Sequence, residues 1–302
     1  QNENVKAVEF LLSNPDIDIN SYFDKGNQIT QYKGEVNVST NVDENETEIK
    51  DISKEKSQFI EYKTALHIAV ENGNTEIISL LLNHPNINVN NKTVEKNIGG
   101  HGDSYGDLDY STTSYTRIMK SALHIAIQNN DYESVELLID HPSIDVNSIS
   151  KYDYCYHYYY QSERRYGYTR NSENAIELKT LLFLAIESLN IKIIQLLLSK
   201  SEIDVNHPSC IITNRDELIN YLDILASDDV LDEVDFYDYP DIKPEIIKQT
   251  PLSLAFEKEN DDIISLLLSN PTIDVHQDNA LSKVIKNGNV DIYNKLLSQT
   301  GY

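Results

Sequence analysis

Hydrophobic and polar positions follow a pattern that recurs four times along this chain. Four segments of 27 residues align without gaps, and the first reads TALHIAVENGNTEIISLLLNHPNINVN. Its apolar residues fall at helical spacing in two short runs and then alternate as in an extended segment. Thr64 stands where a helix N-cap is expected, and Pro85 ends the second run. The pattern predicts two short helices in each segment, at residues 64–90, 121–147, 180–206 and 250–276.

Two partial copies flank the four complete segments. Residues 1–20 keep only the second half of the pattern, VKAVEFLLSNPDIDIN, and residues 279–302 hold a more polar copy with Lys283 and Lys286. A repeat cannot bury its own hydrophobic face, so stacking supplies the core and the end units must shield it. We therefore expect the polar copy to cap the stack. We also expect further repeats before Gln1, because the first unit lacks its first helix.

These segments resemble the ankyrin repeat. The resemblance is carried by the T-A-L-H-I-A opening, the central N-G, the triple-Leu second helix and the D-V-N ending. The N-P-x-I-D-V-N form is similar to ankyrin repeats of some single-celled eukaryotes. The resemblance implies one domain, residues 1–302, folded as an all-α repeat solenoid of about five to six units. It also implies that the motif histidines, His67 and His124, bond backbone groups.

The motif histidine is missing from three copies. Phe183, Ser253 and Ser282 replace it. By analogy with the family, we expect those loops to lack one hydrogen bond.

Long insertions separate the repeats. They occupy residues 21–61, 91–119, 148–178 and 207–248. Each lies between a closing D-V-N and the next opening motif, where the ankyrin family has its β-turn finger. Because repeats stack in register, the insertions should emerge along one edge of the solenoid as extended β-hairpin fingers. Long loops on a rigid scaffold are where binding surfaces usually lie.

Tyrosines are concentrated in these insertions. Of 20 tyrosines, only Tyr132, Tyr293 and Tyr302 lie outside the insertions and their edges. In the third insertion alternate positions are tyrosine on the way out, at Tyr152, Tyr154, Tyr156, Tyr158 and Tyr160. Tyr166, Tyr168 and Arg170 continue the alternation on the return. Residues 162–165 can form the turn. The pattern predicts a long hairpin with an aromatic face.

The predicted partner-binding residues follow from this composition and from the family geometry. Tyrosine with Ser, Gly and Asn is the mixture that antibody combining sites use. The predicted set is Tyr152, Tyr154, Tyr156, Tyr158, Tyr160, Tyr166, Tyr168, Tyr110, Tyr115, Tyr237 and Tyr239 in the fingers, with Glu71, Asn72, Gln128 and Asn129 on the concave helical surface. Two alternatives stay open. The rings could only brace neighbouring fingers, or the fingers could pair edge to edge between copies of the protein.

The other insertions carry weaker patterns. Val36, Val38, Thr40 and Val42 alternate and suggest a strand, and residues 99–102 (GGHG) suggest a turn before an alternating stretch at 110–117. Residues 214–222 predict a short helix. The stretch after it, residues 228–241, is strongly acidic and would suit a basic partner if it does more than remain solvated.

Charge narrows the classes of partner. The net charge is -24, which repels nucleic acid and anionic membranes. A protein with a basic patch would be attracted. No apolar run is long enough to span a bilayer, and no signal peptide is apparent. We expect a monomeric, cytoplasmic protein.

Candidate catalytic and ligand motifs are incomplete. Cys155 and Cys210 are the only cysteines, and free thiols are favoured over a bridge between them. Cys155 and His157 lack an orienting third group for catalysis. Asp103, Asp107 and Asp109 lack the loop pattern of a calcium site, and the GGHG stretch lacks a phosphate loop's Lys. We therefore predict no enzyme activity, no cofactor and no metal.

Overall fold

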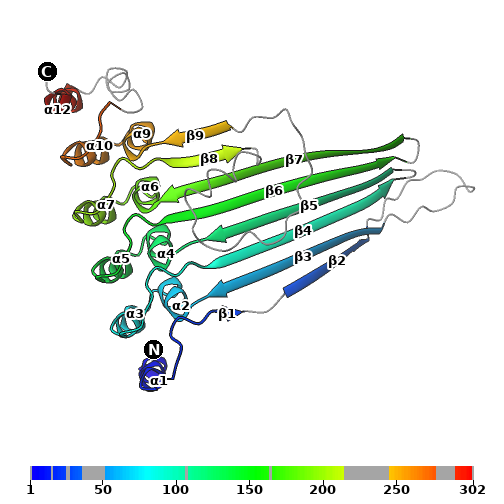
Figure 1. The fold of residues 1–302 in the computed structure, drawn as a ribbon, viewed down its shortest axis with the longest axis horizontal. Helices are drawn as coiled ribbons and strands as arrows, with labels where there is room; N and C mark the ends of the chain where they lie inside the picture. The colour runs from blue at the N-terminus through cyan, green and yellow to red at the C-terminus, as the bar shows by residue number, and fades with distance from the viewer. Residues whose placement is uncertain are drawn as a thin grey trace, which may run out of the picture.

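The computed structural model describes most of the chain. The described residues are 2–14, 16–24, 28–35, 52–105, 108–162, 165–213, 245–276 and 290–300. Paired helices stack into a solenoid, and a broad sheet extends from one side of the stack (Figure 1). The predicted strand at 36–42, the predicted helix at 214–222, the acidic stretch at 228–241 and Ser282 lie outside the described residues.

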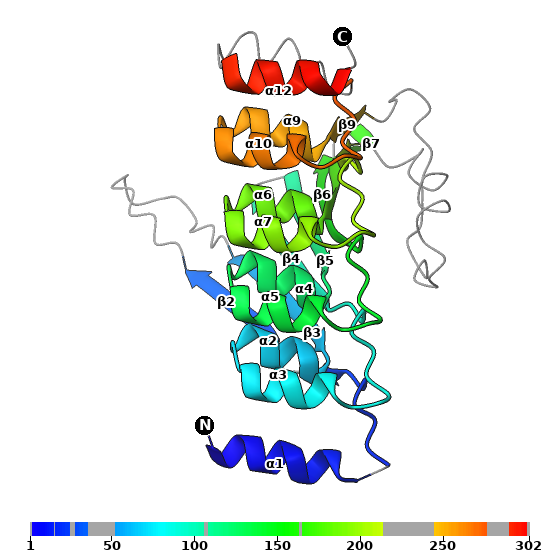
Figure 2. The same cartoon turned by 90° about the vertical axis from the view of Figure 1, so that its left-hand side faces the viewer.

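Each complete repeat forms one pair of helices where the periodicity predicts it. The first helices are α2 (Ala65–Glu71), α4 (Ala122–Gln128), α6 (Leu181–Glu187) and α9 (Pro251–Glu257). The second helices are α3 (Thr75–Leu82), α5 (Tyr132–Ile139), α7 (Ile191–Leu198) and α10 (Asp261–Leu268). The helix pairs stack in chain order (Figure 2). Helix α1 (Asn2–Leu12) lies at one end of the stack and α12 (Val290–Thr300) at the other.

One hydrophobic core runs through the stack between first and second helices. Leu138 and Leu197, at equivalent positions of successive second helices, are fully buried. Leu11 occupies the same position in α1 but is 53% exposed, because the described chain has no first helix beside α1. The core therefore depends on contact between units, as expected for a solenoid.

All four insertions contribute strands to a single antiparallel sheet. The strands are β1 (Phe23–Asp24), β2 (Gln28–Glu35), β3 (Ile52–Lys63), β4 (Val94–Tyr105), β5 (Leu108–Met119), β6 (Ile149–Ser162), β7 (Arg165–Thr180), β8 (Ser209–Thr213) and β9 (Glu245–Gln249). Their order is β1-β3-β4-β5-β6-β7-β8-β9, and β2 also pairs with β3. The expected repeat solenoid is present, but the description as all-α does not hold, because the insertions form one antiparallel sheet. Adjacent fingers pair with one another because a long isolated hairpin would leave its outer backbone groups unpaired.

The register corrects one predicted turn and agrees with another. Ser162 pairs with Arg165 across the end of the β6–β7 hairpin, at the residues where the sequence predicts a turn. Residues 99–102 instead lie within β4, where Gly99 pairs with Ser114 on one side and Ser57 on the other. Pairing with two flanking strands outweighs the local preference of glycine for turns.

A turn of the same backbone geometry joins the two helices of every complete repeat. One residue in each of these turns has a positive φ: +61° at Gly73, +59° at Asn130, +55° at Leu189 and +51° at Glu259. Only the first of these is glycine, the residue that adopts this conformation without steric cost. The other three turns therefore hold a side chain in the left-handed region.

An asparagine at the end of each unit ties it to the next. Asn90 Nδ2 donates to the carbonyl of Ser143 at 2.7 Å, and its Oδ1 accepts from the backbone N–H of Asp145 at 2.9 Å. Asn20, Asn147 and Asn206 make the equivalent pair of bonds to the following unit. These bonds fix the spacing of successive repeats and hence of the strands attached to them.

Candidate functional site

The sheet and the first helices meet along a corner that runs the length of the stack. We call the side of the sheet that turns toward the first helices the inner face. One row of paired positions crosses it from strand to strand: Glu61, Glu95, Ile118, Tyr152, Glu177, Ile211 and Ile247. The row begins with two glutamates at its N-terminal end and finishes with two isoleucines at its C-terminal end.

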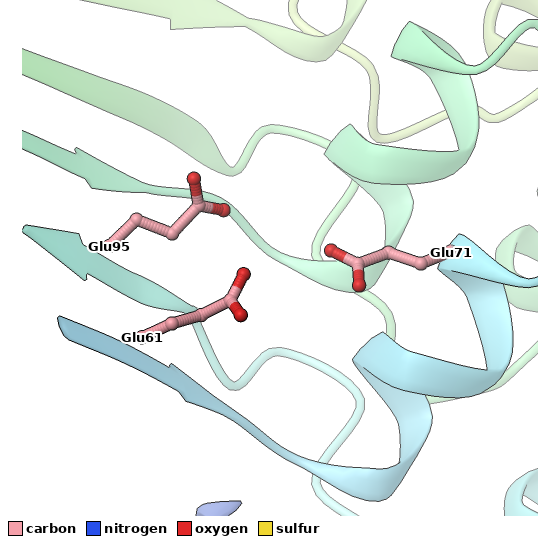
Figure 3. A group of neighbouring side chains, drawn as sticks. All are labelled: Glu61, Glu71 and Glu95. Atoms are coloured by element: carbon pink, nitrogen blue, oxygen red, sulfur yellow. The ribbon is translucent and has the colours of Figure 1, made fainter. Parts of the chain in front are cut away.

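Three carboxylates converge at the N-terminal end of the corner. Glu61 of β3, Glu95 of β4 and Glu71 of α2 point toward one another (Figure 3), and one oxygen of each lies within 4.8 Å of the others. Lys63 Nζ forms ion pairs with Glu61 and Glu71, and Lys120 Nζ lies 3.8 Å from Glu95. The two lysines supply the positive charge that a bound cation would otherwise bring to these carboxylates.

Lys63 stays protonated in this cluster. Burial alone would lower its pKa, but hydrogen bonds to Glu61 and Glu71 raise the pKa above the ordinary lysine value. Its ammonium group is therefore a permanent part of the corner at neutral pH. The cluster is an internal ion-pair network, and it does not resemble a set of metal ligands awaiting an ion.

The lysine position recurs in successive repeats. Lys179, like Lys63, directly precedes the N-cap of a first helix. Its Nζ donates to Glu187 at 3.0 Å and lies 3.5 Å from Glu177. It also lies 5.8 Å from the centre of the Tyr152 ring, within the range of a cation–π contact. Burial alone would lower the pKa of Lys179, but its hydrogen bonds to the two glutamates raise it above the ordinary lysine value.

Tyr152 braces the corner. Its ring is almost fully buried, at 9% exposure, and its hydroxyl accepts a hydrogen bond from Gln128 Nε2 at the end of α4. Burial raises the pKa of its phenol, against the lowering effect of the Gln128 bond. For this residue the structure supports the bracing alternative, since a partner has little of the ring to contact.

Four further tyrosines of β6 follow Tyr152 along the strand at alternate positions. Tyr154, Tyr156, Tyr158 and Tyr160 occupy alternate positions of the strand, which belong to the inner face. Tyr110 of β5 pairs directly with Tyr160 and joins the same face. We call Tyr154, Tyr156, Tyr158, Tyr160 and Tyr110 the tyrosine column; the side chain of Tyr154 is half-buried.

Three predicted tyrosines do not belong to that face. Tyr115 pairs with Cys155, which lies between two column positions of β6. Thr169 and Asn171 are the residues of β7 that pair with the column, so Tyr166 and Tyr168 fall on the alternate positions. The prediction that they continue the aromatic face is wrong, because even-numbered residues of β6 pair with odd-numbered residues of β7 at both Tyr160–Thr169 and Ser162–Arg165. Tyr237 and Tyr239 lie outside the described residues.

The predicted helical residues lie at the C-terminal ends of the first helices. Asn72 and Asn129 are the C-cap residues of α2 and α4, and both are exposed. Glu71 and Gln128 precede them and contact Lys63 and Tyr152. The structure therefore brings these positions beside the inner face, although two of the four side chains already have internal partners.

The motif histidines serve as helix caps. His67 Nδ1 accepts from the backbone N–H of Thr64 at 3.1 Å, and its Nε2 lies 2.9 Å from the carbonyl of Asn91. His124 makes the equivalent bond to Ser121 at 3.2 Å. Burial lowers the pKa of His67 to about 4 and that of His124 to about 3, so both are neutral at pH 7.

Where the histidine is replaced, the N-cap hydroxyl makes the cap instead. Thr180 Oγ1 accepts from the backbone N–H of Phe183, and Thr250 Oγ1 accepts from that of Ser253, each at 3.2 Å. The expected loss of a hydrogen bond in these loops is thus offset by a direct N-cap bond.

The outer face of the sheet has a small hydrophobic cluster of its own. Cys210 is buried and packs with Ile176, Leu178 and Ile212. Its neighbours are apolar, which disfavours the thiolate form that reactive cysteines need. The side chain of Cys155 is outside the described part of the structure.

Comparison with known families agrees with this architecture. The fold is a solenoid of stacked helix pairs with fingers at one edge, and the family model for ankyrin repeats, in three copies, matches residues 40–150. Residues 40–150 are therefore similar to ankyrin repeats, and such repeats are generally non-catalytic modules of protein–protein interaction. A search of curated proteins found no match. Among the helices that the structure describes, none combines the length and hydrophobicity needed to cross a membrane.

Proposed function

We propose that this protein is a non-catalytic scaffold that binds another protein along the inner face of its sheet. The observation that carries the proposal is the tyrosine column. Five tyrosine positions share the face of the sheet that adjoins the first helices. A continuous sheet holds them in fixed register, so little conformational freedom is lost when a partner binds.

The chemistry of tyrosine suits this role. Its ring offers a large contact area with two rotatable bonds, and its hydroxyl can donate or accept a hydrogen bond. Aromatic side chains often carry most of the binding energy of a protein interface. Tyr152, which is buried against Gln128, fixes the inner end of the column and is not itself a contact residue.

The net charge favours a partner with a basic patch. At -24 the protein attracts cationic surfaces over distances set by the ionic strength. Such attraction raises the association rate more than the final affinity. The tyrosine column and the acidic surface therefore have separate roles in binding.

The test uses peptides selected from a displayed random library against the intact chain, with dissociation constants measured by fluorescence anisotropy. The triple variant Tyr154→Ser, Tyr156→Ser, Tyr158→Ser should bind the selected peptides at least about tenfold more weakly. Tyr115→Ser, on the alternate positions of β5, is the matched control and should bind normally.

Thermal denaturation of the same variants separates contact from bracing. A midpoint close to that of the unchanged protein together with lost binding supports the proposal. Unchanged binding by the triple variant would contradict it, and a collapse of stability would assign these rings to bracing.

A second candidate, self-assembly through the sheet, rests on the edge strand β9. Ile246 is 39% exposed there and Ile247 is 50% exposed, and an exposed apolar edge strand favours pairing with another copy. Light scattering over a range of concentrations tests it. A mass that rises with concentration and returns to that of a monomer in Ile246→Lys would favour assembly.

A further inference from the structure

A lysine side chain lies in the corner just before the first helix of three complete repeats, but the fourth complete repeat has no lysine at this position. Lys63, Lys120 and Lys179 each directly precede an N-cap and lie within 4.0 Å of a glutamate oxygen. Gln249 occupies this position before α9. The repeat geometry is otherwise retained, since Gln249 and Glu257 are spaced like Lys63 and Glu71.

Glu257 keeps its place but has no cation beside it in the described structure. Gln249 Nε2 donates to Glu257 Oε2 at 2.6 Å. Among the described residues, no Lys, Arg or His nitrogen forms an ion pair with Glu257, that is, none lies within 4.0 Å of one of its carboxylate oxygens. The side chain of Glu257 is exposed, whereas Glu187 at the equivalent position is bonded to Lys179. An amide satisfies one oxygen of this carboxylate and leaves its charge uncompensated.

An apolar pair lies next to this carboxylate. Ile211 of β8 pairs directly with Ile247 of β9 on the inner face, and the two are 39% and 50% exposed. Ile247 precedes Gln249 by two residues, so both belong to the same face of β9. In the same row, Glu61 and Glu177 come before Lys63 and Lys179, whereas Ile118, between Glu95 and Tyr152, comes before Lys120.

We propose that Glu257, Ile211 and Ile247 form a docking site for a Lys or Arg side chain of the partner, with an apolar side chain of the same segment on the two isoleucines. This inference rests on the proposed function and specifies the chemistry of the partner at one end of the inner face. The partner cation takes the place that Lys179 fills in the preceding repeat, where Nζ lies 3.0 Å from Glu187.

The spacing favours an extended partner segment. Residues i and i+2 of a strand are about 7 Å apart on one face, and Ile247 and Gln249 are separated by this interval. A segment with an apolar residue and a basic residue two positions apart therefore matches both features. Exposed ion pairs contribute modestly to affinity, so the isoleucines supply most of the attraction and Glu257 selects for the cation.

The test measures binding of a fluorescein-labelled peptide of repeated Leu-Ser-Lys-Ser to the full chain by anisotropy. Its counterparts carry Gln in place of Lys or Ser in place of Leu. Glu257→Gln should weaken binding of the Lys peptide by about threefold to fivefold and should not change binding of the Gln peptide. Gln249→Lys should weaken it similarly, because an internal lysine then occupies Glu257. Ile247→Ser should weaken it by about tenfold.

Glu259→Gln is the matched control, since it removes the same charge from a nearby exposed position. If it weakens the Lys peptide as much as Glu257→Gln, attraction to the overall negative charge explains the binding and the proposed site is wrong. Unchanged binding in both Glu257→Gln and Gln249→Lys also overturns it.

Failure here is distinguishable from failure of the proposed function. Loss of library-selected peptides in the triple tyrosine variant, together with normal Leu-Ser-Lys-Ser binding by Glu257→Gln, leaves the scaffold role in place and rejects only this site.

Discussion

Asn147 Oδ1 accepts a hydrogen bond of 2.8 Å from the backbone N–H of Asp204 in the next repeat. The same side chain donates to the carbonyl of Glu202 at 2.7 Å. One residue thus satisfies two backbone groups across the junction of two repeats. Since an equivalent asparagine ends the neighbouring units, these junctions are built alike.

Asn147→Ala should lower the free energy of unfolding by about 1–2 kcal/mol, because two hydrogen bonds between repeats are lost at a solvent-accessible junction. Urea denaturation followed by circular dichroism measures the change. Asn129→Ala is the control, since its side chain makes no bond to another repeat among the described residues, and it should change stability by less than about 0.5 kcal/mol. Equal effects of the two substitutions would argue against a role for the junction bonds.

Leu189→Gly and Glu259→Gly should each stabilise the protein by about 0.5–1 kcal/mol. Both residues have positive φ, a conformation that costs a side chain about 1–2 kcal/mol, part of which is offset by the entropy of glycine in the unfolded chain.

Gly73→Ala should lower the stability of the protein, the opposite effect. A Cβ at Gly73 would lie 3.6 Å from Asp131 Oδ2, an ordinary contact, so its cost arises from φ alone. Calorimetric midpoints check all three.

Stability should fall as the pH decreases from 6.5 to 5 because of the buried histidines. The folded-state pKa of His67 is lowered to about 4 and that of His124 to about 3, so the unfolded state binds more protons in this range. Each histidine should reduce the free energy of unfolding by about 1.5 kcal/mol over that interval. Denaturant titrations at several pH values measure the loss.

The double variant His67→Phe, His124→Phe provides the control for this pH effect. Phe183 occupies the same position in the third repeat and is compatible with a Thr N-cap there. The variant should show a flatter dependence between pH 6.5 and 5. An unchanged slope would assign the pH dependence to other groups.

Lys63→Met should lower the free energy of unfolding by about 3 kcal/mol, because it leaves Glu61 buried near Glu71 and Glu95 without its cation. The carboxylates of the variant then gain from protonation on folding, so its deficit should shrink as the pH falls from 7.5 to 5. Lys151→Met is the control, since Lys151 lies 4.0 Å from Asp153 on the outer face; it should cost less than about 1 kcal/mol.

Calcium or EDTA should leave the melting midpoint of the unchanged protein where it is, because Lys63 already lies among the carboxylates of Glu61, Glu71 and Glu95.

The repeat core could be predicted because its determinants are local. Apolar spacing and helix-ending residues place α2 and α3 within the first 27-residue segment, and the Ser162–Arg165 turn follows from the alternation on either side of it. The lysine that precedes an N-cap and the glutamate eight residues later are also visible once the copies are aligned, as with Lys63 and Glu71. Their function as an ion pair becomes clear only when β3 and α2 are placed side by side.

The sheet could not be predicted in the same way because its pairing is not local. Nothing in the sequence around Tyr110 indicates that it lies opposite Tyr160, since that register depends on how two repeats stack. The GGHG stretch has the composition of a turn, yet β3 and β5 hold it in a strand. The tyrosines of the return strand belong to the opposite face for a different reason. Ser162 pairs with Arg165, so even-numbered residues of β6 lie opposite odd-numbered residues of β7, and tyrosines at even positions of both strands cannot share a face.

The length of the fingers also makes them levers. Strand β6 has 14 residues, so its far end lies roughly 45 Å from its start at the stack, at about 3.3 Å per residue. A rotation of about 5° between two neighbouring repeats would move the end of an attached finger by about 4 Å, by simple geometry from the same rise per residue. Because the fingers are joined into one sheet, they would have to move together, as a bend or twist of the whole surface. Small elastic changes in the helical stack are thereby converted into changes of curvature at the far end of the sheet.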